Sequence, residues 1–309
     1  MSTFNYSFYG EGIMYPPDLA PNISAIQQAG WTSVILSLFH IDANGNIIYN
    51  NPMIIQNGTY VGDPAWPGQV AQLKGGSVNT ILASIGGWDV SDFSNLKTIY
   101  NNNNNSFQGT LLQSNFQVFR TTFPDISIID MDCENTYDQD SFVAFCEMLI
   151  EIGFGITFCP YDLGELDFWT GSLAAIQSNY PGGVKWWNLQ CYAGGGGNTQ
   201  GVLPIWLNAI RKAIPGFNTD GYIQVSDWSR FWNVPEYGPP YWDGDCPQAV
   251  QNWISQFNGD ASVGGAFIWN LDQILTYEST EQQHPDPQSC GNVGMTDYVN
   301  AMKAALGSS

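Results

Sequence analysis

Positive charge is the scarcest feature of this chain. Its 309 residues include 8 Lys and Arg against 28 Asp and Glu, which gives a net charge of −20. Because phosphate groups are bound mainly by Lys and Arg, we expect neither a nucleic acid nor an anionic membrane surface as a partner. No apolar run reaches the roughly 18 residues that cross a bilayer. This composition suits a neutral ligand better.

Histidine and paired cysteine motifs are also scarce. His40 and His284 are the only two histidines and lie far apart, and the six cysteines form no CxxC pair. The sequence therefore predicts no metal site, no cofactor and no Ser-His-Asp triad. Cys246 and Cys290 fall in expected loops and would pair in an oxidising compartment, whereas the other four are expected as buried free thiols.

The N-terminus lacks the basic start and the apolar segment of a signal peptide. We therefore expect a protein that stays in the cytoplasm or leaves the cell by a route that this sequence does not display. Nothing in the sequence indicates an oligomer, and we expect a monomer.

Aromatic residues are abundant, with 12 Trp, 15 Tyr and 17 Phe. Most must lie in the core, but aromatic faces also stack on flat apolar surfaces such as those of sugar rings. Five tryptophans lie in or near loops that follow expected strands, and one or two of them are candidates for contacts with distal sugars: Trp66, Trp88, Trp228, Trp232 and Trp242.

Short apolar runs alternate with longer amphipathic ones along the whole chain. The expected strands are 6–9, 33–39, 80–84, 126–132, 155–158, 185–190, 221–225 and 265–269. The expected helices are 23–29, 66–74, 111–119, 141–152, 173–179, 202–214, 247–257 and 295–306, the fourth capped by Asp140 and ended by Gly153. Eight such units predict an α/β protein, a closed (β/α)8 barrel that occupies residues 1–309 as one domain. The alternative, a doubly wound open sheet, often has a G-x-G-x-x-G turn after its first strand, which is absent here.

Two glycine-containing segments interrupt this pattern. Residues 42–63 are long for a loop between a strand and a helix, and the turn Asn44-Gly45-Asn46 between apolar residues predicts a hairpin insertion after the second strand. The run Gly194–Gly197 lacks the Lys-Ser/Thr of a P-loop and gives little support for phosphate binding.

The most informative segment is Asp130-Met131-Asp132-Cys133-Glu134, which follows an apolar, β-branched run. Side chains alternate between the faces of a strand, so Asp130, Asp132 and Glu134 share one face. Such crowding raises the pKa of one member, as a general acid near neutral pH requires. A solvated strand end or a cation site is the alternative interpretation.

Four segments in order resemble motifs of glycoside hydrolase family 18, the chitinase-like barrels. Ser84-Ile85-Gly86-Gly87 resembles the SxGG motif at the end of the third strand, and residues 127–134 resemble DxxDxDxE at the end of the fourth. Gln190-Cys191-Tyr192 resembles the QxY form of hevamine-like plant chitinases, and residues 264–269 resemble the last strand, which ends in a floor tryptophan.

The resemblance implies hydrolysis of β-1,4 bonds in chitin or related glycans, assisted by the substrate's own acetamido group. By this resemblance Glu134 acts as the acid and later as the base, and Asp132 accepts a hydrogen bond from the acetamido N–H. Asp130 is a deeper carboxyl that shares a proton with Asp132, and Tyr192 donates a hydrogen bond to the acetamido oxygen. The resemblance also implies that six residues contact the substrate: Tyr6, Ser84, Gly87, Trp88, Gln190 and Trp269.

Two departures from the family pattern keep other functions open. Ser127 replaces the first Asp of DxxDxDxE, and Ala193 stands where Asp or Asn commonly follows the tyrosine. The alternatives are a catalytically silent, lectin-like barrel that binds glycans or proteins, and an endo-β-N-acetylglucosaminidase that acts on N-glycans. A toxin component that attacks chitin-bearing hosts would use the same chemistry. Tyr192 and Trp269 could also be ordinary core aromatics, and His40 is expected to have a structural role.

Overall fold

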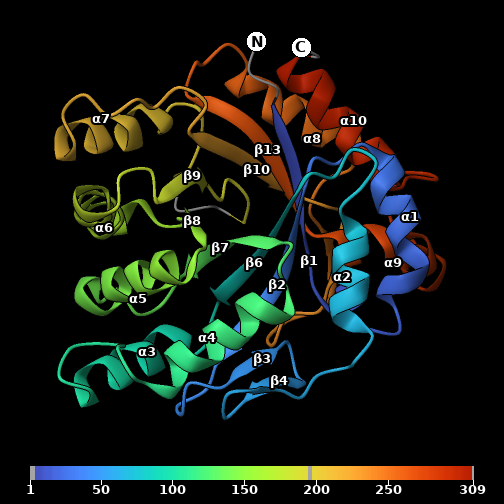
Figure 1. The fold of residues 1–309 in the computed structure, drawn as a ribbon. Helices are drawn as coiled ribbons and strands as arrows, with labels where there is room; N and C mark the ends of the chain where they lie inside the picture. Colours follow the sequence, from blue (N-terminus) through green and yellow to red (C-terminus); the bar gives the residue numbers. More distant parts are fainter. Residues whose placement is uncertain (1–3, 194–196, 308–309) are drawn as a thin grey trace.

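Eight parallel strands form a closed barrel in this computed structural model, which describes residues 4–193 and 197–307 (Figure 1). The barrel strands are β1 (Asn5–Gly10), β2 (Ser33–Ile41), β6 (Thr80–Gly87), β7 (Ile126–Cys133), β8 (Gly155–Phe158), β9 (Val184–Asn188), β10 (Ile223–Trp228) and β13 (Val263–Trp269). β1 pairs with both β2 and β13, which closes the sheet. The predicted (β/α)8 barrel is therefore confirmed. Most of the run Gly194–Gly197 lies outside the described residues.

Helices surround the strands in Figure 1. They are α1 (Leu19–Ala29), α2 (Trp66–Leu73), α3 (Asp92–Asn102), α4 (Leu111–Thr122), α5 (Gln139–Ile152), α6 (Leu166–Asn179), α7 (Leu203–Ala213), α8 (Pro247–Ile254), α9 (Leu271–Gln283) and α10 (Met295–Leu306), with short 3₁₀ turns at Gly12–Met14, Leu163–Glu165 and Ser255–Phe257. Helices α3 and α9 were not predicted, because their polar composition hides their apolar stripes. The predicted N-cap of α5, Asp140, was also wrong. The Asp138 side chain accepts a hydrogen bond from the Ser141 N–H, and Asp140 lies in the first turn.

The barrel strands bury both faces, because the helices cover the outside and side chains fill the inside. Inward-facing residues form a compact apolar cluster: Tyr9, Ile35, Leu82, Ile128, Cys159 and Phe267. Outward-facing residues pack under the helices in a much larger cluster. The four cysteines outside the disulfide are buried free thiols, as expected.

Two insertions extend the barrel. The first is the predicted hairpin insertion after β2, with β3 (Ile47–Tyr49), β4 (Met53–Gln56) and β5 (Thr59–Tyr60) paired antiparallel at the edge of β2. The second is the antiparallel hairpin of β11 (Phe231–Asn233) and β12 (Tyr241–Asp243), which was not predicted. A disulfide between Cys246 and Cys290 joins the segment after β12 to the segment after α9.

Within the described residues, no helix is long and apolar enough to cross a membrane.

Candidate active site

The acidic row of β7 lies on one face of the strand, as its alternation predicted, and that face points into the barrel. Asp130 and Asp132 are buried and Glu134 is partly exposed just beyond the strand end, whereas Met131 and Cys133 pack outward under the helices. The row therefore rises from the barrel interior to its mouth. This is the end at which the loops after the strands gather in (β/α)8 barrels.

Asp130 lies deepest and is held by four donors. Its Oδ2 accepts from the hydroxyls of Tyr9 and Ser84, both at 2.8 Å. Its Oδ1 accepts from Thr157 Oγ1 at 2.6 Å and from Asn188 Nδ2 at 2.9 Å. Burial raises the pKa of Asp130, and these four hydrogen bonds lower it. All four donors are neutral side chains, and the sharing of a proton between Asp130 and Asp132 that the resemblance implies stays a prediction.

Asp132 and Glu134 are coupled to each other. Gln190 Nε2 donates to Asp132 Oδ1 at 2.9 Å and to Glu134 Oε1 at 3.1 Å. Burial raises the pKa of Asp132 well above 3.8, and the charges of Glu134 and Asp130 raise it further. Burial also raises the pKa of Glu134 above 4.5, although hydrogen bonds from Gln190 and Asp132 oppose this. The pair can therefore keep a proton at pH values where an exposed carboxyl has lost it.

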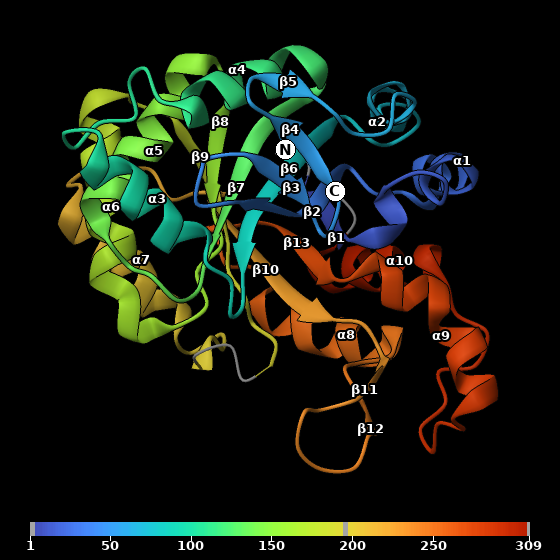
Figure 2. The same ribbon diagram turned by 90° about the horizontal axis from the view of Figure 1, so that it is seen from below.

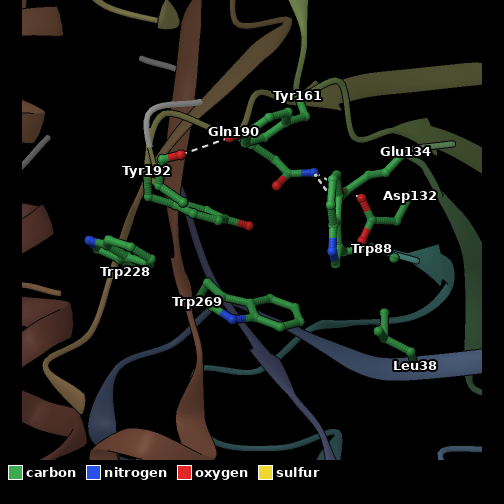
Figure 3. A pocket seen from close by; sticks show the side chains of 11 residues that line it. Leu38, Trp88, Asp132, Glu134, Tyr161, Gln190, Tyr192, Trp228 and Trp269 are labelled. Carbon is green, nitrogen blue, oxygen red and sulfur yellow. Dashed lines mark hydrogen bonds between the residues drawn. The ribbon is translucent and has the colours of Figure 1, made fainter. Parts of the chain in front are cut away.

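A cavity of about 340 Å³ opens above this pair (Figure 3). Its lining residues are Leu38, Gly87, Trp88, Asp132, Glu134, Tyr161, Gln190, Tyr192, Ala193, Trp228 and Trp269. Its volume lies in the range of small-ligand sites, and an aromatic lining with a few converging polar groups is typical of them. None of the described lining residues is Lys, Arg or His.

Tyr192 and Trp269 form part of the wall and the floor of this cavity. The Tyr192 ring stacks on Trp228 with centroids 6.1 Å apart, and its hydroxyl points into the cavity in Figure 3. Burial raises the pKa of Tyr192 well above 10, so its hydroxyl keeps its proton. Trp269 ends β13 and is braced from below by Tyr9, at 5.5 Å between centroids. Both line the cavity rather than the buried core.

Of the other predicted contact residues, three line the cavity, one supports it from below and one lies outside it. Gly87, Trp88 and Gln190 line the cavity, and Trp88 is 77% exposed at its rim. Ser84 is fully buried and donates to Asp130, so it supports the site from below.

Tyr6 lies outside the site. Its side chain points outward, and Lys303 Nζ of α10 lies 5.7 Å from the centroid of the Tyr6 ring. Placing Tyr6 in the site was wrong because the inward face of β1 carries Tyr9, at the opposite parity.

The glycine positions of SxGG have a steric explanation. Gly86 and Gly87 both have positive φ, 116° and 107°. A Cβ on Gly86 would meet the Asp132 carbonyl oxygen at 2.1 Å, and one on Gly87 would meet Leu38 Cδ1 at 2.7 Å. Side chains here would therefore displace the end of β7 or the cavity wall, and only glycine allows this close approach.

Three supporting residues had no sequence signal that singled them out. Thr157 and Asn188 donate to Asp130, and Trp186 Nε1 donates to Asn188 Oδ1 at 2.9 Å, which directs the Asn188 NH₂ toward the acid. They come from neighbouring strands β8 and β9, and only barrel closure brings them to Asp130. His40 is structural as expected, with Nδ1 2.9 Å from Asp92 Oδ2.

Among the residues that the structure describes, no group of three or more His, Cys, Asp or Glu side chains is arranged to hold a metal ion.

Several solved structures share this architecture. A GH18 chitinase from Pseudoalteromonas aurantia aligns with a TM-score of 0.62 at 12% identity, over 98% of this chain and 100% of that chain. The Group IV chitinase of Ostrinia furnacalis gives 0.61 at 12% identity, over 98% and 99%. The spore cortex-lytic enzyme SleL of Bacillus cereus gives 0.62 at 10% identity, over 99% and 75%. Similarity at this level shows the fold, a (β/α)8 barrel like those of these glycoside hydrolases. No family model and no curated protein sequence matches the chain.

Proposed function

We propose that this protein hydrolyses β-1,4 bonds in N-acetylglucosamine-containing glycans, chitin or chito-oligosaccharides, with the substrate's acetamido group as the nucleophile. The observation that carries the proposal is the coupled pair of Asp132 and Glu134, bridged by Gln190 beneath an aromatic-lined cavity. The four motifs in order, including the hevamine-like Gln190-Cys191-Tyr192, support it, as does the barrel shared with chitinases.

In this proposal Glu134 first acts as the acid. It donates its proton to the glycosidic oxygen while the acetamido carbonyl oxygen attacks C1, so that the C1–O bond breaks and a cyclic oxazolinium forms. Asp132 accepts a hydrogen bond from the acetamido N–H and offsets the positive charge. Glu134, now ionised, then takes a proton from water, whose oxygen attacks C1 and reopens the ring. The net reaction is hydrolysis with retention.

The remaining cavity residues position the sugar. The Tyr192 hydroxyl, which its raised pKa keeps protonated, donates to the acetamido oxygen. Trp269 provides an apolar floor for the sugar ring. Asp130 does not line the cavity and acts on the substrate only through Asp132, whose pKa its charge raises.

A silent, glycan-binding barrel is the second candidate. The observation that favours it is Ala193, which contributes a methyl group to the cavity wall where the family commonly has a polar side chain. Its carbonyl oxygen is occupied by the Tyr161 hydroxyl at 2.7 Å.

Hydrolysis of a fluorogenic chitotriose at acidic and neutral pH tests the proposal, with Glu134→Gln as the matched control. Cleavage by the parent and not by the variant is expected, because the amide keeps the shape of Glu134 and has no acidic proton. Binding of chito-oligosaccharides without cleavage by either protein would favour the silent barrel. If neither occurs, an N-glycan substrate tests endo-β-N-acetylglucosaminidase activity.

A further inference from the structure

A second cavity, of about 330 Å³, lies between the β11–β12 hairpin and α9. Figure 2 shows this hairpin projecting from the body of the molecule beside α8 and α9. None of its lining residues takes part in the chemistry proposed above.

Aromatic rings form one side of this second cavity. Trp232 on β11 and Trp242 on β12 lie 5.6 Å apart between ring centroids. Trp232 stacks flat against His284, at 4.6 Å and 4°, and Trp242 meets the edge of Tyr277 at 5.4 Å. Hydroxyl and amide side chains from α9 complete the lining: Gln273, Thr276, Thr280 and Gln283.

The second cavity offers no free charge to a ligand. Arg230 is its one permanently charged lining residue, and Nε and Nη2 donate to the two carboxylate oxygens of Asp286 at 2.9 and 2.8 Å. Arg230 Nη1 donates to the Gly244 carbonyl at 3.0 Å. A phosphate or carboxylate ligand would therefore compete with Asp286, and a cationic ligand would find no unpaired carboxylate in the lining. A neutral ligand with apolar faces and hydroxyl groups fits best.

The two sides of the second cavity are tied together. The Cys246–Cys290 disulfide links the chain after β12 to the chain after α9. Trp242 Nε1 donates to the His284 carbonyl at 2.9 Å, and the Cys290 N–H donates to the Tyr277 hydroxyl at 2.9 Å. A cavity held in shape in this way loses little conformational entropy when a ligand binds.

The second cavity adjoins the first. Trp228 lines the first cavity and Phe231 lines the second, and their rings meet edge to face at 5.3 Å between centroids. A polysaccharide bound at one cavity is therefore close to the other.

We propose that the second cavity is an additional glycan-binding site, which takes a neutral sugar unit between its tryptophans and the amide and hydroxyl groups of α9. On the proposed function, the natural occupant is another segment of the polysaccharide substrate. Two tethered sites on one chain raise the effective concentration of polymer at the catalytic cavity. The gain applies to long or insoluble substrates and not to a trisaccharide.

Titration calorimetry with chitohexaose tests the site in the Glu134→Gln protein, which we expect to bind two molecules. Adding Trp232→Ala or Gln283→Ala should weaken one of the two sites by about tenfold or more, the scale of one lost stacking or hydrogen-bonding contact. The matched control is Gln282→Ala, because Gln282 is the exposed neighbour of Gln283 and does not line the cavity. In the active protein, Gln283→Ala should slow hydrolysis of insoluble chitin several-fold and leave chitotriose turnover unchanged.

A single binding site in Glu134→Gln, or two sites that both Trp232→Ala and Gln283→Ala leave intact, would overturn the inference. Gln283 is exposed, so its variant keeps the test valid if Trp232→Ala fails to fold. Binding at the second site by a protein that cleaves no N-acetylglucosamine glycan would support this inference and overturn the proposed function.

Discussion

The two cavities are nearly equal in volume, about 340 and 330 Å³, and both are lined by tryptophans and glutamine. They differ in how nearby acids are compensated: Asp132 and Glu134 line the first cavity, whereas Asp286 contacts the lining residue Arg230 of the second and does not itself line it. Asp132 and Glu134 face one amide and each other, whereas Asp286 faces Arg230, with which it forms a bidentate pair.

This difference gives the acids opposite protonation behaviour. Burial and like charge raise the pKa values of Asp132 and Glu134, whereas Arg230 lowers the pKa of Asp286. Asp286 therefore stays ionised to a lower pH than an exposed carboxyl does, which suits a structural ion pair. Asp132 and Glu134 keep a proton to a higher pH than an exposed carboxyl does, which suits acid–base chemistry.

The largest effect on folding is expected from Asp286→Asn. It leaves the buried Arg230 without its anion and should lower the free energy of unfolding by about 3 kcal/mol at pH 7. Because the folded-state pKa of Asp286 lies below its unfolded value, this loss should fade as the pH falls through that lowered pKa. Denaturant unfolding at pH 7 and pH 3 measures both. Chitotriose turnover at a temperature where the variant is folded should stay within about twofold of the parent, and a large loss would show that the two cavities are not separate.

Asp132→Asn should instead leave folding intact and lower kcat/KM for chitotriose by about a hundredfold, a typical contribution of a positioned charge in the transition state. The asparagine keeps the shape of the side chain and removes the anion that offsets the oxazolinium. Steady-state kinetics check this, with Glu134→Gln beside it. Unaltered turnover would rule out assistance by the acetamido group.

The pH profile should show the same contrast. Because the acid must be protonated, kcat/KM should fall by about tenfold per pH unit above the raised pKa of the Asp132–Glu134 pair, which burial places above the ordinary carboxyl value of 4.5. Stability should also decline as the pH rises from about 4 through this raised pKa, because the unfolded chain loses these protons first. A fall in kcat/KM that begins at or below pH 4.5 would contradict a pKa raised by burial. Asp286→Asn should not move the pH at which this fall begins.

The smallest effect is expected from Thr157→Val, which removes one of the four donors to Asp130. A single lost hydrogen bond to a buried charge should cost about 2 kcal/mol of stability, and turnover should fall only a few-fold because three donors remain. Thermal unfolding and chitotriose kinetics measure both. A loss of turnover as large as that of Asp132→Asn would give Asp130 a more direct role.

The sequence predicted strands and helices best where apolar residues recurred with a clear strand or helix period. All eight barrel strands and the hairpin insertion after β2 were expected, although α3, α9 and the β11–β12 hairpin were not. That Asp130, Asp132 and Glu134 share one face of β7 followed from strand alternation alone. Tyr6 was misplaced because alternation does not say which parity of β1 faces inward, and Tyr9 faces inward instead.

By itself, the sequence determined the order of strands and helices and the acidic row on one face of β7, because these depend on neighbours within a few residues. Only the tertiary structure decided what compensates each acid. Tyr9 reaches Asp130 across 121 residues, Gln190 reaches Glu134 across 56, and Arg230 reaches Asp286 across 56. These contacts form when the barrel closes, and burial in a closed barrel is what moves the pKa values. The sequence therefore determined which carboxyls gather, and the fold decided which of them can exchange a proton.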